Sequence, residues 1–130
     1  MICLVRQKLV SATPEERIRQ ILLHQMLHDL SFPKGLISVE KKIGAMNRRV
    51  DIVVYLKKES RLMPLLLIEC KAGEADEESA YRQAVGYQAT LSAPFWSLAH
   101  GQGIRTFWLE NGVLHSVPFL PPYPQLIMGL

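Results

Sequence analysis

The stretch "PLLLIECKAG", residues 64–73, places the aliphatic run Leu65 to Ile68 directly before an acid and a lysine. A continuous aliphatic run is typical of a strand that is buried on both faces, so we expect this segment to be a central strand of a sheet. Alternate residues of a strand point to the same face. The buried strand is therefore expected to end with Glu69 and Lys71 on one side.

The preceding segment "VDIVVYL", residues 50–56, is β-branched and aromatic and predicts a second strand, joined to the first by the polar connection "KKESR". A short connection makes the two strands an antiparallel hairpin. If the turn is centred near Ser60, the numbers of paired residues sum to about 120, and Asp51 lies opposite Glu69. This register would place Asp51, Glu69 and Lys71 on one face, whereas a slip of one residue would separate them.

Two carboxylates and an ammonium group in this arrangement suit the hydrolysis of phosphodiester bonds. Two nearby carboxylates repel each other unless a cation lies between them. Their hard oxygen atoms suit Mg²⁺ or Mn²⁺, and Mg²⁺ keeps bound waters and bridges to phosphate oxygens. A neighbouring lysine can orient or help deprotonate a water molecule and stabilise charge on phosphorus. The alternative interpretation is an ordinary solvated strand end.

The other segments complete an α/β domain with a mixed central sheet flanked by helices. Thr13 as N-cap, Pro14 at the first helical position and Glu16 in a capping box predict a helix within residues 11–30. The remaining patterns predict a strand at 36–43, a helix at 73–93, strands at 94–100 and 104–110, a turn at Asn111–Gly112 and a strand at 113–117.

Composition indicates one globular domain covering residues 1–130, with 48% hydrophobic and 21% charged residues. The Pro-rich apolar tail, residues 118–130, is expected to lie extended over the body or against a second copy or partner protein. No run reaches the roughly 18–20 apolar residues that cross a bilayer, so we expect a cytoplasmic protein without membrane contact. Residues 1–61 contain 12 Lys and Arg and 6 Asp and Glu, a basic excess that suits nucleic acid; the alternative interpretation, which charge alone favours, is an ordinary solvated surface.

Four segments together resemble the nuclease domain at the N-terminus of type I restriction enzyme R subunits, within the PD-(D/E)xK or restriction endonuclease-like superfamily. The segments are "TPEERIRQILLHQML", "RRVDIVVY", "LLLIECKAG" and "YRQAVGY", in matching order between about residues 11 and 90. The resemblance implies a core of helix, three strands, helix and strands. It also implies a Mg²⁺-dependent deoxyribonuclease that acts as an endonuclease.

The resemblance implies roles for single residues in the hairpin. Asp51 and Glu69 would be the metal-binding acids, and the backbone carbonyl of Cys70 would be a further ligand. Lys71 would be the catalytic lysine. Val50 stands before Asp51 where the family pattern has proline, which is a mild departure.

An acid from the first helix often lies near the metal in this superfamily, and Glu15 and Glu16 both match. We favour Glu15, because it shares a helix face with Ile18, Leu22 and Met26 and because Glu16 serves the capping box. Other residues are expected to shape the site or to contact DNA. These are Gln83 and Tyr87, which match a Gln-x-x-x-Tyr pattern, and the basic residues Arg48, Arg49 and Lys41.

The R subunits of type I enzymes continue into an ATP-driven motor, whereas this sequence has no GxxxxGK[ST] phosphate loop. We therefore expect a nuclease domain without a motor. The alternative function is a non-catalytic DNA-binding or assembly module that keeps the fold. A third possibility is a protein that mainly oligomerises through residues 118–130.

Overall fold

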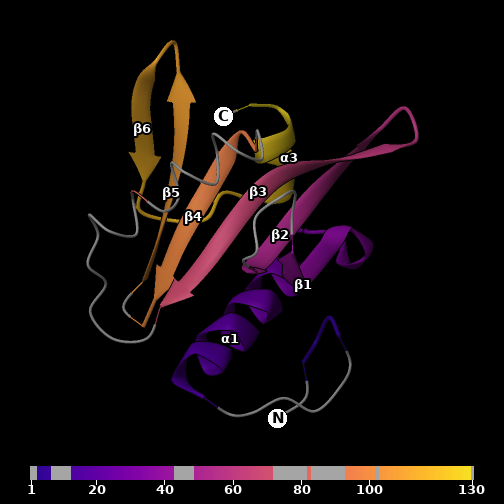
Figure 1. Cartoon of the computed structure of the whole chain (residues 1–130), viewed down its shortest axis with the longest axis vertical. Helices are drawn as coiled ribbons and strands as arrows, with labels where there is room; N and C mark the ends of the chain where they lie inside the picture. Colours follow the sequence, from indigo (N-terminus) through magenta and orange to yellow (C-terminus); the bar gives the residue numbers. More distant parts are fainter. Residues whose placement is uncertain are drawn as a thin grey trace.

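Six strands form one mixed sheet in the described part of the chain, in the order β1-β2-β3-β4-β5-β6 (Figure 1). The structure is a computed structural model that describes residues 3–6, 13–42, 49–71, 82, 93–101 and 103–129. β3 and β4 are parallel and the other neighbours are antiparallel. The elements are α1 Pro14–His28, η1 Lys34–Leu36, β1 Ile37–Lys42, β2 Arg49–Lys58, β3 Arg61–Lys71, β4 Phe95–His100, β5 Gly103–Glu110, β6 Val113–Val117 and α3 Tyr123–Ile127.

These elements confirm the α/β class and the mixed sheet. The predicted helix at 73–93 lies outside the described residues, apart from Arg82, which is helical, and Ala93. The Asn111–Gly112 turn is present, with φ of 51° and 76°, and joins β5 to β6 as predicted. Positive φ at both central residues is what a two-residue hairpin turn requires, which explains why Asn-Gly is a reliable signal.

β3 lies inside the sheet, between β2 and β4, as the aliphatic run predicted. Residues 65–68 are all buried. Leu66, Ile68 and Cys70 pack into one hydrophobic cluster, while Leu67 packs into a second cluster on the opposite face. Full burial of one Leu or Ile side chain stabilises by about 1.5–3 kcal/mol. The aliphatic run therefore holds β3 in place from both faces.

α1 covers one of these faces and begins where the sequence predicted. The Thr13 hydroxyl accepts a hydrogen bond from the backbone N–H of Glu16 at 3.1 Å, which caps the helix. Leu22, Leu23 and Met26 are buried in the same cluster as Ile68. In Figure 1 the N-terminal half of α1 lies beside the end of β3.

The β2–β3 hairpin is longer than predicted, because residues 57, 58 and 61 belong to the strands rather than to a polar loop. Only Glu59 and Ser60 form the turn, with φ of 51° and 64°. Lys58 pairs directly with Arg61. A two-residue turn with positive φ at both positions matches the strand twist, so the strands stay paired up to the tip.

The hairpin register near Asp51 is the predicted one. Ile52 pairs with Ile68, so that the next pair along the hairpin would be Asp51 and Glu69. An irregularity between Val54 and Tyr55 shifts the register by one residue relative to the tip. A slip of one residue at the inner end would turn the buried side chains of β3 to the wrong faces, so burial enforces this register.

The C-terminal tail folds onto the core instead of lying extended, which corrects the sequence prediction. Leu120 and Leu126 are buried in the cluster beneath α1, and residues 123–127 form α3. The Tyr123 N–H donates to the carbonyl of Leu30 at 3.0 Å. Prolines fix a φ that is compatible with the first turn of a helix, so a Pro-rich segment can begin a short helix as well as extend.

Leu126→Ala is expected to lower the free energy of unfolding by about 3 kcal/mol, because it empties a site in the core. Urea unfolding followed by circular dichroism measures the change. Met128→Ala is the control, since Met128 is 86% exposed and its loss should cost under about 0.5 kcal/mol. Equal stabilities of the two variants would show that the tail is not part of the folded core.

Candidate functional site

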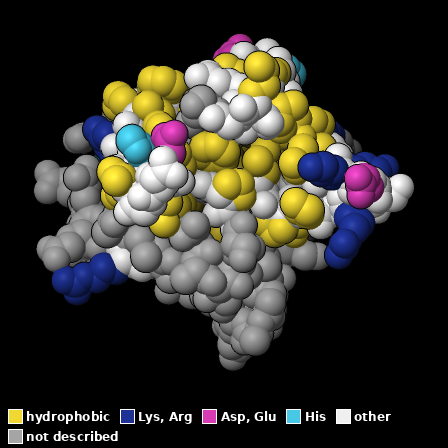
Figure 2. Space-filling view, turned by 90° about the horizontal axis from the view of Figure 1, so that it is seen from above, with side chains coloured by type: hydrophobic (Ala, Val, Ile, Leu, Met, Phe, Trp, Pro, Cys, Tyr) yellow, Lys and Arg dark blue, Asp and Glu magenta, His cyan; other side chains and the backbone are white. Residues whose placement is uncertain are grey.

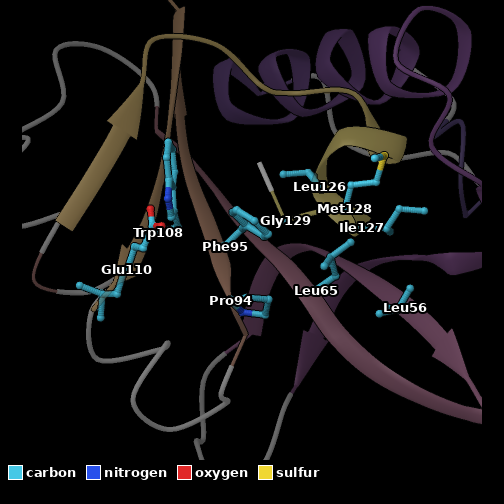
Figure 3. Close-up of a pocket in the computed structure, with 11 residues that line it drawn as sticks. Leu56, Leu65, Pro94, Phe95, Trp108, Glu110, Leu126, Ile127, Met128 and Gly129 are labelled. Atoms are coloured by element: carbon cyan, nitrogen blue, oxygen red, sulfur yellow. The ribbon is translucent and has the colours of Figure 1, made fainter. Parts of the chain in front are cut away.

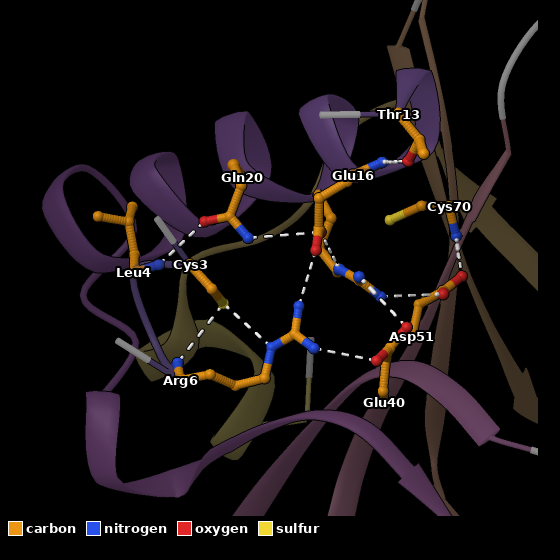
Figure 4. Close-up of polar contacts among 10 residues, drawn as sticks. Cys3, Leu4, Arg6, Thr13, Glu16, Gln20, Glu40, Asp51 and Cys70 are labelled. Carbon is orange, nitrogen blue, oxygen red and sulfur yellow. Dashed lines mark hydrogen bonds and ion pairs between the residues drawn. The ribbon is translucent and has the colours of Figure 1, made fainter. Parts of the chain in front are cut away.

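Asp51 lies against the segment that carries the acid and the lysine of β3. Its Oδ2 accepts a hydrogen bond from the backbone N–H of Cys70 at 2.7 Å (Figure 4). Backbone N–H groups of a strand point toward the neighbouring strand, so this carboxylate oxygen lies between β2 and β3. Glu69 and Lys71, on either side of Cys70, are both half-buried.

The orientation of Asp51 differs from the predicted single face. The side chain of Cys70 packs on the face covered by α1, so alternation sends Glu69 and Lys71 out on the opposite face. Oδ1 of Asp51 lies 3.3 Å from Nη1 of Arg19 on α1. The carboxylate therefore sits at the junction of the two strands, with one oxygen on the β3 amide and the other toward α1.

A local irregularity in β1 and β2 explains this orientation. Their pairing passes from Val39 and Ile52 to Lys41 and Val50, and the register between these strands skips Glu40 and Asp51. Glu40 has a φ of 54°, which is unusual for a residue that is not glycine. The register is the same on both sides of this gap, so the strands are distorted locally at Glu40 and Asp51 without an inserted residue. Asp51 and Glu40 are thereby both turned toward arginines.

Two arginines and three carboxylates form a connected ionic network beneath α1 (Figure 4). Arg19 contacts Glu16, Glu40 and Asp51, the last two at 3.4 and 3.3 Å. Arg6 contacts Glu16 at 2.7 Å and Glu40 at 2.9 Å. Three negative and two positive groups leave one negative charge in excess, at a place where a further cation would be attracted.

The network is buried at one end and open at the other. The side chains of Glu16 and Arg19 are only 6% and 8% exposed, whereas those of Asp51 and Glu40 are 24% and 39% exposed. A ligand from solvent can therefore reach Asp51 but not Glu16. Burial opposes the charge on Arg19, yet its hydrogen bond and charge contacts with Glu16, Glu40 and Asp51 raise its pKa, so Arg19 stays positively charged.

The two candidate helix acids have different surroundings. Glu15 lies on the same side of α1 as Leu22 and Met26 but is exposed, whereas those two residues are buried. Glu16 is buried, and its carboxylate accepts from Arg19 and Arg6. Charged arginine donors form stronger hydrogen bonds than a neutral backbone N–H, so the expected use of Glu16 in a capping box is replaced.

Burial would by itself raise the pKa of Glu16. The hydrogen bond and charge of Arg19, with smaller effects of Gln20 and Arg6, outweigh burial and lower the pKa of Glu16 below its ordinary value. Glu16 is therefore ionised at neutral pH, and its ion pairs stabilise the folded state.

Cys70 contacts Asp51 through its backbone N–H, whereas its thiol is buried. Burial raises the pKa of the Cys70 thiol, and the negative charges of Asp51, Glu69 and Glu15 raise it further. The thiol thus stays protonated and packed in the core. The positive charge of Arg19 acts in the opposite direction and lowers the pKa of this thiol, but it does not outweigh burial.

Some predicted site residues are not positioned by the structure. Lys41 and Arg49 lie in β1 and β2, but their side chains fall outside the described part. Arg48, Gln83 and Tyr87 lie outside the described residues altogether. Their roles stay predictions.

Sequence reasoning missed several neighbours of the site. Arg6, Arg19 and Glu40 come from distant segments, and only the Glu16–Arg19 spacing on one helix hinted at an ion pair. His100 pairs with Lys71 across the parallel strands β3 and β4, which puts both residues on one face. Its position at the end of β4 was predicted, but the strand pairing was not.

An apolar pocket of about 440 Å³ lies away from Asp51, between α3 and the sheet (Figure 3). Among the described residues that line it, Glu110 alone is charged, so this part of the lining does not offer paired carboxylates for hydrolysis. Its main apolar residues are Leu56, Leu65, Phe95, Trp108, Leu126 and Met128.

The described residues lack two features that matter for the predicted metal site and for membrane contact. No three His, Cys, Asp or Glu side chains among them are grouped so that they could hold a metal ion by themselves. No described helix is long and apolar enough to span a membrane. A metal at the end of β3 would therefore need backbone oxygen, water or substrate oxygen beside its acidic ligands.

Glu16→Gln is expected to lower the free energy of unfolding at pH 7 by roughly 3 kcal/mol, because it breaks buried ion pairs. The folded-state pKa of Glu16 is lowered, so its stabilisation is complete above the ordinary value of 4.5 and is lost as the pH falls through the folded pKa. Urea unfolding of both proteins from pH 7 to pH 3 should show the difference shrinking below about pH 4.5.

Glu15→Gln is the matched control, since the exposed neighbouring acid should change stability by less than about 0.5 kcal/mol. A stability difference between Glu16→Gln and the unmodified protein that is the same at every pH would contradict the ionic role of Glu16.

Comparison with known proteins identifies the family. The family profile described as type I restriction enzyme R protein N terminus (HSDR_N) matches residues 14–121, which run from the start of α1 through β6. No curated protein and no solved structure matches the chain. The match covers most of the chain and agrees with the resemblance of the four sequence segments. The chain belongs to the family of type I restriction enzyme R protein N-terminal domains.

Proposed function

We propose that this protein is a metal-dependent nuclease with a restriction endonuclease-like fold, which hydrolyses phosphodiester bonds within DNA. Membership of a restriction enzyme family supports a nuclease-related domain. The observation that carries the proposal is the 2.7 Å hydrogen bond from the Cys70 amide to Asp51. It brings an acid from β2 onto the Glu-x-Lys segment of β3.

The residues at the end of β3 are chemically suited to Mg²⁺ or Mn²⁺. In this proposal Asp51 and Glu69 hold the ion, together with the Cys70 carbonyl, and the Asp51 carboxylate turns from Arg19 toward the face that carries Glu69. These are hard oxygen donors, and Mg²⁺ in proteins usually takes only one or two carboxylates and keeps several waters. In a strand the N–H and C=O of one residue point to the same neighbour, so the Cys70 carbonyl faces the strand of Asp51. When bound, the ion supplies Lewis acidity and a more acidic water.

Residues of the chain itself perform the remaining tasks in this proposal. Lys71 stabilises the negative charge that develops on the phosphoryl oxygens, from a strand that is anchored by its aliphatic run. Arg19 holds the Asp51 carboxylate by charge before the metal binds. Glu15 is exposed in the first turn of α1, and its proposed role is to orient water.

The DNA-contacting residues belong to the proposal as well. The basic balance of residues 1–61 favours a polyanion, and phosphate contacts position a protein on DNA without reading sequence. Gln83, Tyr87, Arg48, Arg49 and Lys41 are proposed to line the path of the DNA.

A second candidate function is a non-catalytic DNA-binding or assembly module. The contacts of Asp51 favour it, since both oxygens already have donors in Arg19 and Cys70. Calorimetric titration with Mn²⁺ separates the two functions. Heat that is lost in Asp51→Asn supports the nuclease, and absence of binding supports the module.

Lys71→Ala is expected to reduce Mg²⁺-dependent cleavage of plasmid DNA by about 10²–10³-fold, because charge stabilisation in the transition state is lost. DNA affinity should change much less. Lys34→Ala is the control, since Lys34 is exposed on η1 and should cleave at the normal rate. Full activity of Lys71→Ala would refute the assignment of the catalytic lysine.

A further inference from the structure

The tip of the β2–β3 hairpin, defined as residues 57–63, carries a charged and apolar surface that the nuclease site does not use. Every residue of this segment is exposed. The segment contains three basic residues, Lys57, Lys58 and Arg61, and one acidic residue, Glu59. We propose that the hairpin tip is an arm that binds the phosphate backbone of double-stranded DNA. This inference rests on the proposed function for its choice of DNA as partner.

The arrangement of the basic residues argues for an anionic partner. Lys58 and Arg61 pair directly across the two strands. Like charges directly opposite each other on a hairpin destabilise it. In the part of the chain that the structure describes, Lys57, Lys58 and Arg61 have no ion pair or hydrogen-bond partner for their side chains. A phosphate backbone would neutralise the repulsion and supply the missing acceptors.

The turn keeps these cations in a fixed arrangement. Glu59 and Ser60 both have positive φ, a conformation that is unfavourable for residues other than glycine. The strands remain paired up to Lys58 and Arg61. The tip is therefore a two-stranded ribbon rather than a loose loop, and ribbons of this kind are used by several DNA-binding proteins.

Apolar side chains accompany the cations. Leu62 and Met63 are 59% and 47% exposed, and Lys57 pairs with Leu62. Figure 2 shows Lys and Arg side chains gathered at one end of a face beside hydrophobic side chains. DNA-binding arms combine basic residues with exposed apolar residues such as Leu and Met, which contact the floor or base steps of the minor groove.

The tip lies far enough from the candidate site to form a separate contact. Asp51 and Lys58 are both on β2, and their spacing along the strand is about 23 Å at a rise of roughly 3.3 Å per residue. Phosphates of one DNA strand follow each other by roughly 3.4 Å along the axis. A duplex that touches both places therefore spans about seven base pairs, which is less than one helical turn.

The test is the DNA affinity of Lys58→Gln/Arg61→Gln, measured by fluorescence anisotropy with a labelled 20-base-pair duplex and EDTA. We expect affinity at 50 mM salt to fall by roughly tenfold for each lost phosphate contact. The slope of log K against log salt concentration should become shallower by about 2. Both side chains are exposed, so the thermal unfolding temperature should not decrease.

Two matched variants test whether DNA affinity depends on the charge of the hairpin tip and on the position of the lost charge. Glu59→Gln removes the acid of the same turn and should tighten DNA binding several-fold. This change is opposite in direction to the weakening expected for Lys58→Gln/Arg61→Gln. Lys34→Gln removes one positive charge from exposed η1 and should leave the affinity nearly unchanged.

An unchanged DNA affinity and salt slope in Lys58→Gln/Arg61→Gln would refute the proposal that the hairpin tip binds DNA. Failure of the unmodified protein to bind the duplex at 50 mM salt would refute it as well. A change in self-association by light scattering, with unchanged DNA affinity, would also overturn it and assign the tip to a protein contact. EDTA prevents metal-dependent cleavage, so the DNA affinity is measured independently of nuclease activity. The affinity result therefore tests the arm even if the protein does not cleave DNA. Weakened binding in the variant without cleavage by the unmodified protein would support the arm and refute the nuclease.

Discussion

The pairing of β2 with β3 is the constraint on which the candidate site depends. Hydrophobic clusters on both faces of the sheet hold the register in which Ile52 faces Ile68. This register carries Asp51 to the end of β3, where its carboxylate meets the Cys70 amide. A slip by one residue would bury the wrong side chains, so core packing and the position of the acid are coupled. The same pairing, continued to the tip, creates the basic arm.

Charge is distributed along this hairpin in a consistent way. Its inner end gathers carboxylates around Arg19, with an excess of negative charge that favours a cation. Its outer end carries Lys58 and Arg61, which favour an anion. Metal and DNA phosphates are the partners that we propose for these two ends. Arg19 has a particular place in this arrangement, because it binds Asp51 and so orients the acid in the absence of a metal.

Much of the fold could be predicted from sequence, because local signals agreed with burial. The Thr13 cap, the aliphatic run of β3 and the Asn111 turn each define one element by local chemistry. Contacts between distant segments could not be predicted. The local distortion at Glu40, next to the turn of Asp51 toward Arg19, depends on strand pairing, and the burial of Glu16 depends on Arg6 from another segment. The capping-box pattern alone therefore predicted the wrong partner for the Glu16 side chain, which pairs with Arg6 and Arg19.

A crystal structure of the protein soaked with Mn²⁺ tests most directly whether the end of β3 forms a metal site. Anomalous diffraction locates the ion without any need for activity. We predict one anomalous peak at about 2.1 Å from an Asp51 carboxylate oxygen and from the Cys70 carbonyl oxygen, with Glu69 beside it. The peak should be absent in Asp51→Asn. No peak at this position, with Asp51 still held by Arg19 and the Cys70 amide, would contradict the proposed chemistry.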